Sequence, residues 1–317
     1  MEEYPRTLRE FEARFSTESA CREFLFQLRW PEGFICPRCG RHGGWFAKSG
    51  RIICSGCRFG TTVTAGTIFQ DSHQPLTAWF RAMWWMTNQK TGLSGLGFQR
   101  LLGLGSYRTA WMMLHKLRTA MVRPGRDRLT GTIEVDEAYV GGLEEGVRGR
   151  RTEKKSIIVV AAQEDGSGIG RIRMSHIEDA SAASLHGFVN TSLEPGSTIH
   201  TDDWTGYQGL ETKGYRHVAT SIKKSGKQAH ELLPRVHKVI SLFKRWLMGT
   251  HQGAISHEHL DSYLNEFVFR FNRRTSAHRG KLFLRLAQQS VAVEPVPYAG
   301  LIKGVREGRT QKHKRLG

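Results

Sequence analysis

The chain has 317 residues and a formal net charge of +18, with 47 Lys and Arg against 29 Asp and Glu. This length allows roughly two or three domains with separate cores, and so large a positive excess predicts a polyanionic partner, nucleic acid being favoured over a membrane surface. No apolar stretch is long enough to cross a bilayer and residues 1–15 lack the apolar run of a signal peptide, so we expect a cytoplasmic, nucleoid-associated protein.

The first expected domain, residues 1–70, combines a helix with a metal-binding ribbon. The helix is predicted over residues 16–30, where apolar side chains such as Phe24 and Leu25 recur at helical spacing. A glycine-rich stretch with short β-like runs follows the helix, and it carries four of the five cysteines.

Two CxxC pairs separated by 14 residues predict a zinc site formed by Cys36, Cys39, Cys54 and Cys57. Two residues between thiolates let both sulfurs face one tetrahedral Zn²⁺, and the second pair closes the site. Four unrelated buried thiols are the alternative, which this spacing disfavours. Because a closed site of four thiolates has no open position, we interpret the zinc as structural and expect the segment to need it for folding. Cys21 lies outside the pattern and is expected in the core.

Residues 71–123 form a second expected domain, helical and DNA-binding. One helix is predicted after Pro75, a second covers residues 94–102, and a third begins at Ser106, which suits an N-cap. A glycine-containing turn joins the last two helices, an arrangement typical of a helix-turn-helix. The third helix is basic, so DNA contacts are expected from Arg108, Lys116 and Arg118.

The sequence pattern changes after a Pro-Gly linker to alternating strands and helices, over an expected catalytic domain of residues 129–290. The expected elements are strands over 131–142, 154–165 and 170–179, a helix over 181–193, a strand over 198–204, and helices over 234–247 and 256–271. This order predicts an α/β fold with an RNase H-like mixed sheet and flanking helices. Residues 291–317 form a basic C-terminal tail, which we expect to order on DNA.

Carboxylates on two of these strands are the candidate catalytic groups. Glu134, Asp136 and Glu137 lie within one strand, where burial of unpaired acids is costly, so a function is the simplest explanation. Glu134 and Asp136 point to one face of that strand and Glu137 to the other. Asp202 and Asp203 end the fourth strand. Phosphodiester chemistry uses two hard cations about 4 Å apart, for which carboxylates are preferred ligands.

His237 and Lys244 lie seven residues apart on the expected helix over 234–247, and therefore on the same side. Taken singly, each feature has an ordinary structural explanation, since an Asp after a strand often forms a turn and a lone histidine is often a surface or core residue. Their order along the strand–helix pattern favours a metal-dependent phosphoryl-transfer site. No GxSxG, GxGxxG or GxxxxGK[ST] sequence occurs, which argues against a hydrolase triad and an ATP-driven machine.

The blocks GTIEVDEAYVGG, IHTDDWTGY, LPRVHKVISLFKRWLMGTHQG and YLNEFVFRFNRR resemble the catalytic blocks of bacterial insertion-sequence transposases of the zinc-ribbon group. RWPEGFICPRCG and FGTTVTAGTIF resemble the amino-terminal region of that family, so the resemblance covers residues 17–275. It implies a DDE-type triad, whose third member varies between Glu, Asn and His, followed by a lysine. On this chain it places these groups, with two Mg²⁺ or Mn²⁺ ions, at Asp136, Asp202, His237 and Lys244.

The chain departs from the commonest DDE pattern because a histidine stands at position 237. A neutral imidazole is a softer ligand than a carboxylate, and the hypothesis is a shift of metal preference toward Mn²⁺. Glu266 is the alternative third ligand, although a helix-surface pair with Arg270 at i+4 is the favoured interpretation of that residue. Asp203 stands where such proteins more often have a small residue.

The resemblance also implies binding of terminal inverted repeats and target DNA, followed by cleavage and strand transfer within a dimer or larger assembly. Further phosphate contacts are expected from Lys244, Arg245, Arg273 and Arg274. A non-catalytic zinc-ribbon DNA-binding regulator, or a domesticated inactive descendant, is the main alternative, and it leaves the strand-borne acids unexplained. A nuclease that cleaves without joining differs only in its product.

Overall fold

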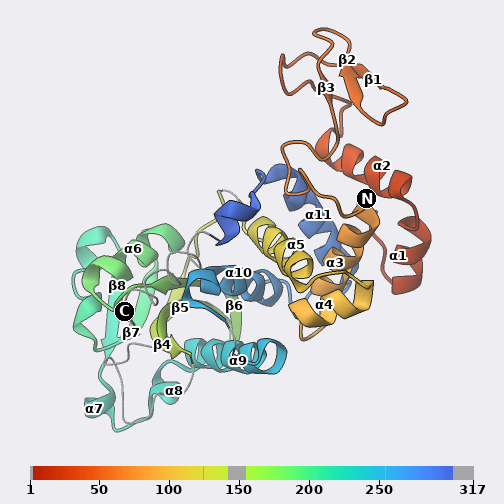
Figure 1. Cartoon of the computed structure of the whole chain (residues 1–317). Helices are drawn as coiled ribbons and strands as arrows, with labels where there is room; N and C mark the ends of the chain where they lie inside the picture. Colours follow the sequence, from red (N-terminus) through yellow and green to blue (C-terminus); the bar gives the residue numbers. More distant parts are fainter. Residues whose placement is uncertain (1–2, 124, 142–154, 254, 303–317) are drawn as a thin grey trace, which may run out of the picture. The chain divides into compact units, whose positions relative to one another are not determined.

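The computed structural model describes residues 3–123, 125–141, 155–253 and 255–302, and the chain divides into two compact units (Figure 1). The helical unit contains residues 1–124 and 276–317, and the sheet unit contains residues 125–275. This division differs from the expected domain limits, because residues 276–290, expected in the catalytic domain, belong to the helical unit. Residues 303–317, most of the expected basic tail, lie outside the described residues.

The helices of the helical unit are α1 (Leu8–Arg14), α2 (Glu18–Arg29), α3 (Leu76–Asn88), α4 (Gly95–Leu102), α5 (Tyr107–Ala120) and α11 (Gly280–Ala292). Hydroxyl groups of Thr17, Ser94 and Ser106 accept backbone N–H groups at the starts of α2, α4 and α5. Gly103 follows α4 with a φ of 62°, the left-handed conformation that often ends a helix. The predicted pair of helices around a glycine turn is therefore confirmed as α4 and α5.

An aromatic cluster joins α11 to the other helices of this unit. Phe283 is 0% exposed, and its ring centroid lies 5.4–6.2 Å from five other aromatic rings. Those rings belong to Phe11, Phe15, Phe24, Phe80 and Trp84. Aromatic pairs at such distances add to the stabilisation that burial of their apolar area supplies. This packing explains why a segment that follows the sheet unit in sequence belongs to the helical unit.

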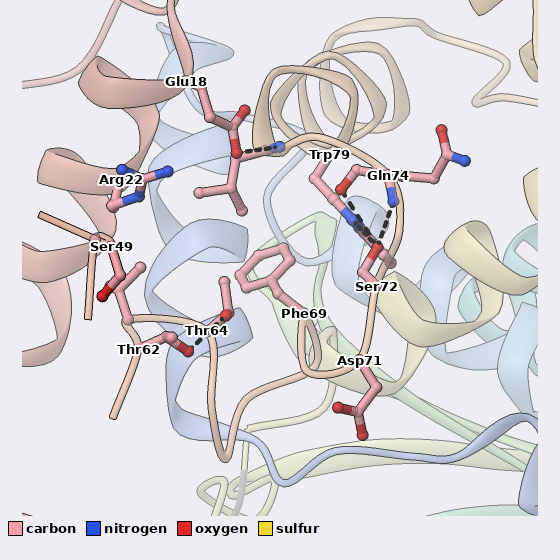
Figure 2. A pocket seen from close by; sticks show the side chains of 13 residues that line it. Glu18, Arg22, Ser49, Thr62, Thr64, Phe69, Asp71, Ser72, Gln74 and Trp79 are labelled. Atoms are coloured by element: carbon pink, nitrogen blue, oxygen red, sulfur yellow. Dashed lines mark hydrogen bonds between the residues drawn. The ribbon is translucent and has the colours of Figure 1, made fainter. Parts of the chain in front are cut away.

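The ribbon is a small antiparallel sheet of β1 (Gly44–Phe46), β2 (Ile52–Cys54) and β3 (Gly60–Thr61), in the order β1-β2-β3. A pocket of about 250 Å³ lies between the ribbon, α2 and the start of α3 (Figure 2). At this pocket the Glu18 carboxylate accepts the N–H groups of Leu76 and Thr77, at 3.0 and 3.3 Å. A carboxylate at a helix amino terminus is favourable, so Glu18 holds α2 against α3.

The sheet unit is built on β4 (Thr132–Val140), β5 (Ser156–Asp165), β6 (Gly168–Ile177), β7 (Thr198–Asp202) and β8 (Arg216–Thr220). Their order is β6-β5-β4-β7-β8, with β4, β5 and β6 antiparallel and β4, β7 and β8 parallel. This mixed order is that of an RNase H-like sheet, which confirms the predicted fold class. The prediction omitted β8, an edge strand with little buried surface.

Helices cover both faces of the sheet (Figure 1). Alternate residues of β4, such as Ile133 and Val135, pack with α6 (Ala182–Ser192) on one face. Ala138 and Val140 pack on the opposite face with α9 (Pro234–His251) and α10 (Leu260–Phe271). Shorter helices are η2 (Thr205–Tyr207), η3 (Glu211–Lys213), α7 (Ile222–Ser225), α8 (Ala229–Leu232) and η4 (His257–His259).

Side chains of α10 and the residue after it protect the free edge of β6. Asn272 pairs with the backbone of Ile172 by accepting its N–H at 2.7 Å and donating to its carbonyl at 3.1 Å. Asp261 accepts the N–H of His176 at 2.9 Å. An unprotected edge invites pairing with another chain, so these polar groups have a structural role. No helix within the described residues has the length and apolarity of a membrane span.

Phe283→Ala should lower the free energy of unfolding by about 3–5 kcal/mol, because it leaves a cavity where the aromatic rings meet. Phe46→Ala is the control, since that ring is 56% exposed and its loss should cost less than about 1 kcal/mol. Urea unfolding followed by tryptophan fluorescence measures both. Equal losses for the two variants would show that the cluster does not hold α11.

Candidate active site and zinc ribbon

The four ribbon cysteines converge on one point. Their Sγ atoms lie within 4.8 Å of one another, with Cys36–Cys57 and Cys39–Cys54 both at 3.7 Å. Tetrahedral zinc with Zn–S bonds of about 2.3 Å requires sulfurs about 3.8 Å apart, so this donor set fits a zinc ion. Within the described ranges, no other group of three or more His, Cys, Asp or Glu side chains brings its ligand atoms that close together.

Backbone groups favour the thiolate form of one of these cysteines. The backbone N–H of Cys57 lowers the pKa of Cys54 to about 6. Desolvation opposes this effect, and the N–H of Gly56 adds to it. A thiolate is the form that binds a metal. Cys21 differs, because it is 0% exposed and burial raises its pKa to about 12. Its predicted place in the core is confirmed.

The parallel pairing of β4 and β7 puts the two candidate aspartates on neighbouring strands. Glu134 lies beside His200 in this pairing, and Asp136 and Asp202 each follow two residues later on their strands. Neighbouring strands lie about 4.8 Å apart. Both aspartates point away from the α6 face, because residues that alternate with them, such as Ile199, pack against α6.

Backbone N–H groups orient both carboxylates. The N–H of Glu137 donates to Asp136 Oδ1 at 2.9 Å, and the N–H of Trp204 donates to Asp202 Oδ1 at 3.1 Å. The Asp136 side chain is 14% exposed and that of Asp202 is partly buried, whereas Asp203 is exposed. Asp136 and Asp202 are therefore held in fixed orientations at one edge of the α9 face.

His237 on α9 faces Asp136, with its Nε2 atom 3.5 Å from Asp136 Oδ2. That Nε2 atom is buried and has no hydrogen-bond partner in the part of the chain that the structure describes. Burial lowers the pKa of His237, assisted by His230 and Lys244 and opposed by Glu134. Adjacent ligands of an octahedral ion with bonds of about 2.1 Å lie about 3 Å apart. A neutral imidazole and a carboxylate at this spacing fit a divalent cation.

Lys244 lies two turns after His237 on the same side of α9, and it is exposed. Partial desolvation lowers the pKa of Lys244, Lys155 lowers it further, and Asp136 raises it. The Lys244 ammonium group is therefore close enough to interact electrostatically with the Asp136 carboxylate and with Lys155. Such a group is well suited to contact a phosphate.

Glu134 anchors the helix that carries His237. It is 4% exposed, and its Oε2 atom accepts the N–H groups of Arg235 and Val236 at 2.7 and 2.9 Å. Its Oε1 atom lies 3.0 Å from the guanidinium of Arg235. The carboxylate therefore satisfies the amino terminus of α9, where negative charge is favoured. This role was not predicted from the sequence. Its one indication was that Glu134 lies on the same face of the strand as Asp136.

Glu137 points to the opposite face of β4, as predicted, and meets Tyr207. The Tyr207 hydroxyl donates to Glu137 Oε2 at 2.9 Å, and the tyrosine is 0% exposed. Burial raises the pKa of Tyr207 well above its usual value, and the carboxylates of Glu137, Asp136 and Asp202 add to the effect. Tyr207 therefore stays a neutral hydrogen-bond donor. Sequence reasoning did not identify this partner, because it lies 70 residues away.

Glu266, the alternative third ligand, lies on α10 with Arg270 Nη1 3.3 Å from its Oε1 atom. The predicted i+4 ion pair is confirmed, but its predicted position on the helix surface is wrong, because Glu266 is 0% exposed. The arginine partner compensates the buried carboxylate, so the pair has a structural explanation that needs no metal.

Two of the three basic residues predicted to contact DNA from α5 are buried. Lys116 and Arg118 are 6% and 1% exposed, and Lys116 Nζ donates to the carbonyl of Gln70 at 3.2 Å. Buried cations of this kind do not meet DNA phosphates, so the prediction for these two residues is corrected. Arg108 is exposed, with its guanidinium 3.9 Å from the ring centroid of Tyr298.

The other predicted phosphate contacts differ in their surroundings. Arg245 on α9 is exposed. Arg273 donates to the carbonyl of Phe269 at 3.1 Å and lies over its ring. Arg274 donates to the carbonyls of Ile169, Gly170 and Phe271. Arg273 and Arg274 therefore make intramolecular contacts whether or not they also meet DNA.

Residues 128–272 match the ISXO2-like transposase domain, and residues 16–59 match the transposase zinc-ribbon domain. The chain belongs to the zinc-ribbon insertion-sequence transposases. The catalytic match contains Asp136, Asp202, His237 and Lys244, and the ribbon match contains the four converging cysteines. The resemblance inferred from the sequence blocks is confirmed.

This transposase is 24% identical over 286 residues to an uncharacterized protein in the transposable element ISH50 of Halobacterium salinarum. The alignment covers 81% of this chain and 91% of that protein. A Mos1 transposase paired-end complex with the left transposon end is 13% identical with a TM-score of 0.29, covering 67% of this chain and 78% of the other. The Mos1 strand transfer complex gives a TM-score of 0.28 at the same identity and coverage. The strand order, rather than these similarities, defines the fold of the sheet unit.

Cys39→Ser should release the zinc ion and unfold β1–β3, because the ribbon has little apolar core to replace it. Zinc content by mass spectrometry should fall from about one ion per chain to below half of that. Cys21→Ser, outside the cluster, should keep the metal. Retention of full zinc by the Cys39 variant would contradict the four-thiolate assignment.

Glu134→Ala should lower the free energy of unfolding by about 3–5 kcal/mol, because it leaves Arg235 and two N–H groups of α9 without their buried acceptor. Glu164→Ala removes the exposed partner of the same arginine and should cost less than about 1 kcal/mol. Chemical denaturation of both variants measures the difference. Similar small losses would show that Glu134 does not anchor α9.

Proposed function

We propose that this transposase binds the terminal inverted repeats of its own mobile element, cleaves DNA at the element ends and joins the freed 3′-hydroxyl to target DNA. One observation carries the proposal. Asp136 and Asp202 lie on neighbouring parallel strands, each two residues beyond the paired Glu134 and His200, and the buried Nε2 atom of His237 faces Asp136. A neutral donor beside two oriented carboxylates matches the ligand chemistry of divalent cations.

Asp136, Asp202 and His237 would hold Mg²⁺ or Mn²⁺ at this place. When bound, such ions polarise the scissile phosphate and lower the pKa of a water nucleophile. The N–H groups of Glu137 and Trp204 keep the two carboxylates oriented, so little rearrangement is needed on binding. The lowered pKa of His237 keeps its imidazole neutral and able to donate its lone pair.

His237 is a better third ligand than Glu266. The imidazole lies 3.5 Å from Asp136, whereas Glu266 is fully buried beside Arg270. Releasing Glu266 to a metal would break the ion pair of a fully buried carboxylate with the partly buried Arg270 guanidinium, which is costly. The imidazole of His237 needs no such exchange.

The exposed side of α9 is suited to follow the DNA backbone. Lys238 and Arg245 lie seven residues apart on it, and therefore on the same side, next to the position of Lys244. Exposed lysine and arginine side chains neutralise phosphates without reading sequence. Sequence recognition would come from the ribbon and from α4 and α5, where Arg108 is exposed at the amino-terminal end of the second helix.

Transposition requires two element ends to be held together, so the active form is proposed to be a dimer or larger assembly on DNA. Both DNA partners are polyanions, in keeping with the formal charge of +18. Affinity for either should fall steeply with salt concentration.

Asp136→Asn, Asp202→Asn and His237→Ala should each reduce cleavage and strand transfer more than about a hundredfold, because loss of a metal ligand exceeds the 10–100-fold cost of losing its supporting groups. Cleavage of DNA carrying the element ends is measured with Mg²⁺ and with Mn²⁺, and DNA binding by gel shift. Binding should persist in all three variants.

Asp203→Asn is the matched control, since it removes the same charge from an exposed neighbour of Asp202 and should retain most activity. Glu266→Gln tests the alternative ligand. Wild-type protein that binds the ends but never cuts with either metal would establish the regulator alternative. Cleavage without joining would establish a nuclease.

A further inference from the structure

A partly buried hydrogen bond joins Glu137 of β4 to Tyr207 of η2, the short helix after β7, on the face of the sheet that α6 covers. Glu137 directly follows Asp136 in β4, and Tyr207 follows Asp202 by five residues. The hydroxyl–carboxylate contact is 2.9 Å long and the tyrosine is 0% exposed. Glu137 points away from Asp136, so its carboxylate cannot share a ligand site with it.

Two residues between Asp202 and Tyr207, Trp204 and Gly206, are closely held. Trp204 donates its N–H to Asp202 Oδ1 at 3.1 Å and its indole N–H to the carbonyl of Ala180 at 2.8 Å. Gly206 has no room for a side chain, since an added Cβ would lie 2.7 Å from both the Ala180 carbonyl and the Trp204 indole nitrogen. Tyr207 and Asp202 are therefore connected through the contacts of Trp204 and Gly206.

Glu137 is tied to Asp136 in a similar way. Its backbone N–H donates to Asp136 Oδ1 at 2.9 Å, so the residue that bonds Tyr207 through its side chain orients Asp136 through its backbone. The hydrogen bond between Tyr207 and Glu137 closes a loop of contacts that contains both aspartates. Removing the hydroxyl opens that loop without removing any ligand.

We propose that Tyr207 and Glu137 form a positioning pair that sets the separation of Asp136 and Asp202 and thereby the affinity of the site for its divalent cations. This inference rests on the proposed function, because it assumes that the two aspartates are metal ligands. In this role neither Tyr207 nor Glu137 is a ligand of DNA or metal. They act through the carboxylates that they hold.

Tyr207→Phe should raise the Mn²⁺ concentration for half-maximal cleavage about tenfold, the effect expected when a group that orients a metal ligand is lost. Cleavage at saturating Mn²⁺ should fall much less. Mn²⁺ binding by electron paramagnetic resonance, without DNA, should weaken by a similar factor. Tyr215→Phe is the matched control, because Tyr215 is also buried in the sheet unit and its hydroxyl donates to the Leu193 carbonyl at 3.2 Å. It should leave both Mn²⁺ midpoints unchanged.

Glu137→Leu removes the acceptor instead of the donor and should shift the Mn²⁺ midpoint in the same direction. The double variant should be no worse than the more affected single variant, because both changes break one bond. Glu137→Gln keeps an oxygen acceptor and should stay near wild type. Glu137→Leu and Glu137→Gln also test the positioning role if Tyr207→Phe does not fold.

Unchanged Mn²⁺ midpoints in folded Tyr207→Phe and Glu137→Leu, beside a wild type that binds Mn²⁺ and cleaves, would overturn the positioning role alone. If the wild-type protein neither binds Mn²⁺ nor cleaves DNA, and so behaves as Asp136→Asn is expected to, the proposed function and this inference are both overturned. Additive shifts in the double variant would also contradict a shared bond.

Discussion

The contact between Glu134 and the amino terminus of α9 determines how the rest of the site is built. Arg235 and Val236, which donate to Glu134, are 101 and 102 positions away from it in sequence. The contact therefore fixes the position of α9 against β4, which local helix and strand propensities cannot do. Burial of a carboxylate costs several kcal/mol of hydration free energy. A few hydrogen bonds to the charged group contribute a stabilisation of similar size. Two N–H groups and the Arg235 guanidinium offset that loss. With α9 held there, His237 comes to face Asp136.

The period of two along β4 assigns different tasks to its three acids. Glu134 and Asp136 share the α9 face, where the first caps the helix and the second faces the imidazole. Glu137 lies on the α6 face, where Tyr207 satisfies it. The acid cluster is therefore not a ligand cluster. Two of its members stabilise the elements on either side of the third, which answers why one strand can carry so many carboxylates.

Local patterns in the sequence predicted the elements whose stability is local. The cysteine spacing identified the ribbon, and Ser106 and Gly103 gave the limits of α4 and α5. The strands β4, β5 and β6 followed from their apolar pattern. The edge strand β8 gave no such signal, because most of its side chains are exposed or half-buried and its pairing with β7 is non-local. The placement of α11, the burial of Lys116 and the partner of Glu137 likewise depend on residues distant in sequence, which no periodicity encodes.

The same reasoning limits what net charge says about DNA binding. A formal charge of +18 predicts a polyanion, yet several cations in the described residues are engaged within the fold. Arg235 pairs with Glu134, Arg274 binds carbonyls near the start of β6, and Lys116 binds the Gln70 carbonyl. Of these partners, Glu134 is a buried carboxylate that folding would otherwise leave unpaired. The position of a basic residue relative to the carboxylates is thus a better guide to DNA binding than the net charge of the chain. On α9 the exposed cations stand on the same helix as His237, so the helix that Glu134 anchors would align a phosphate backbone with the aspartates at the same time.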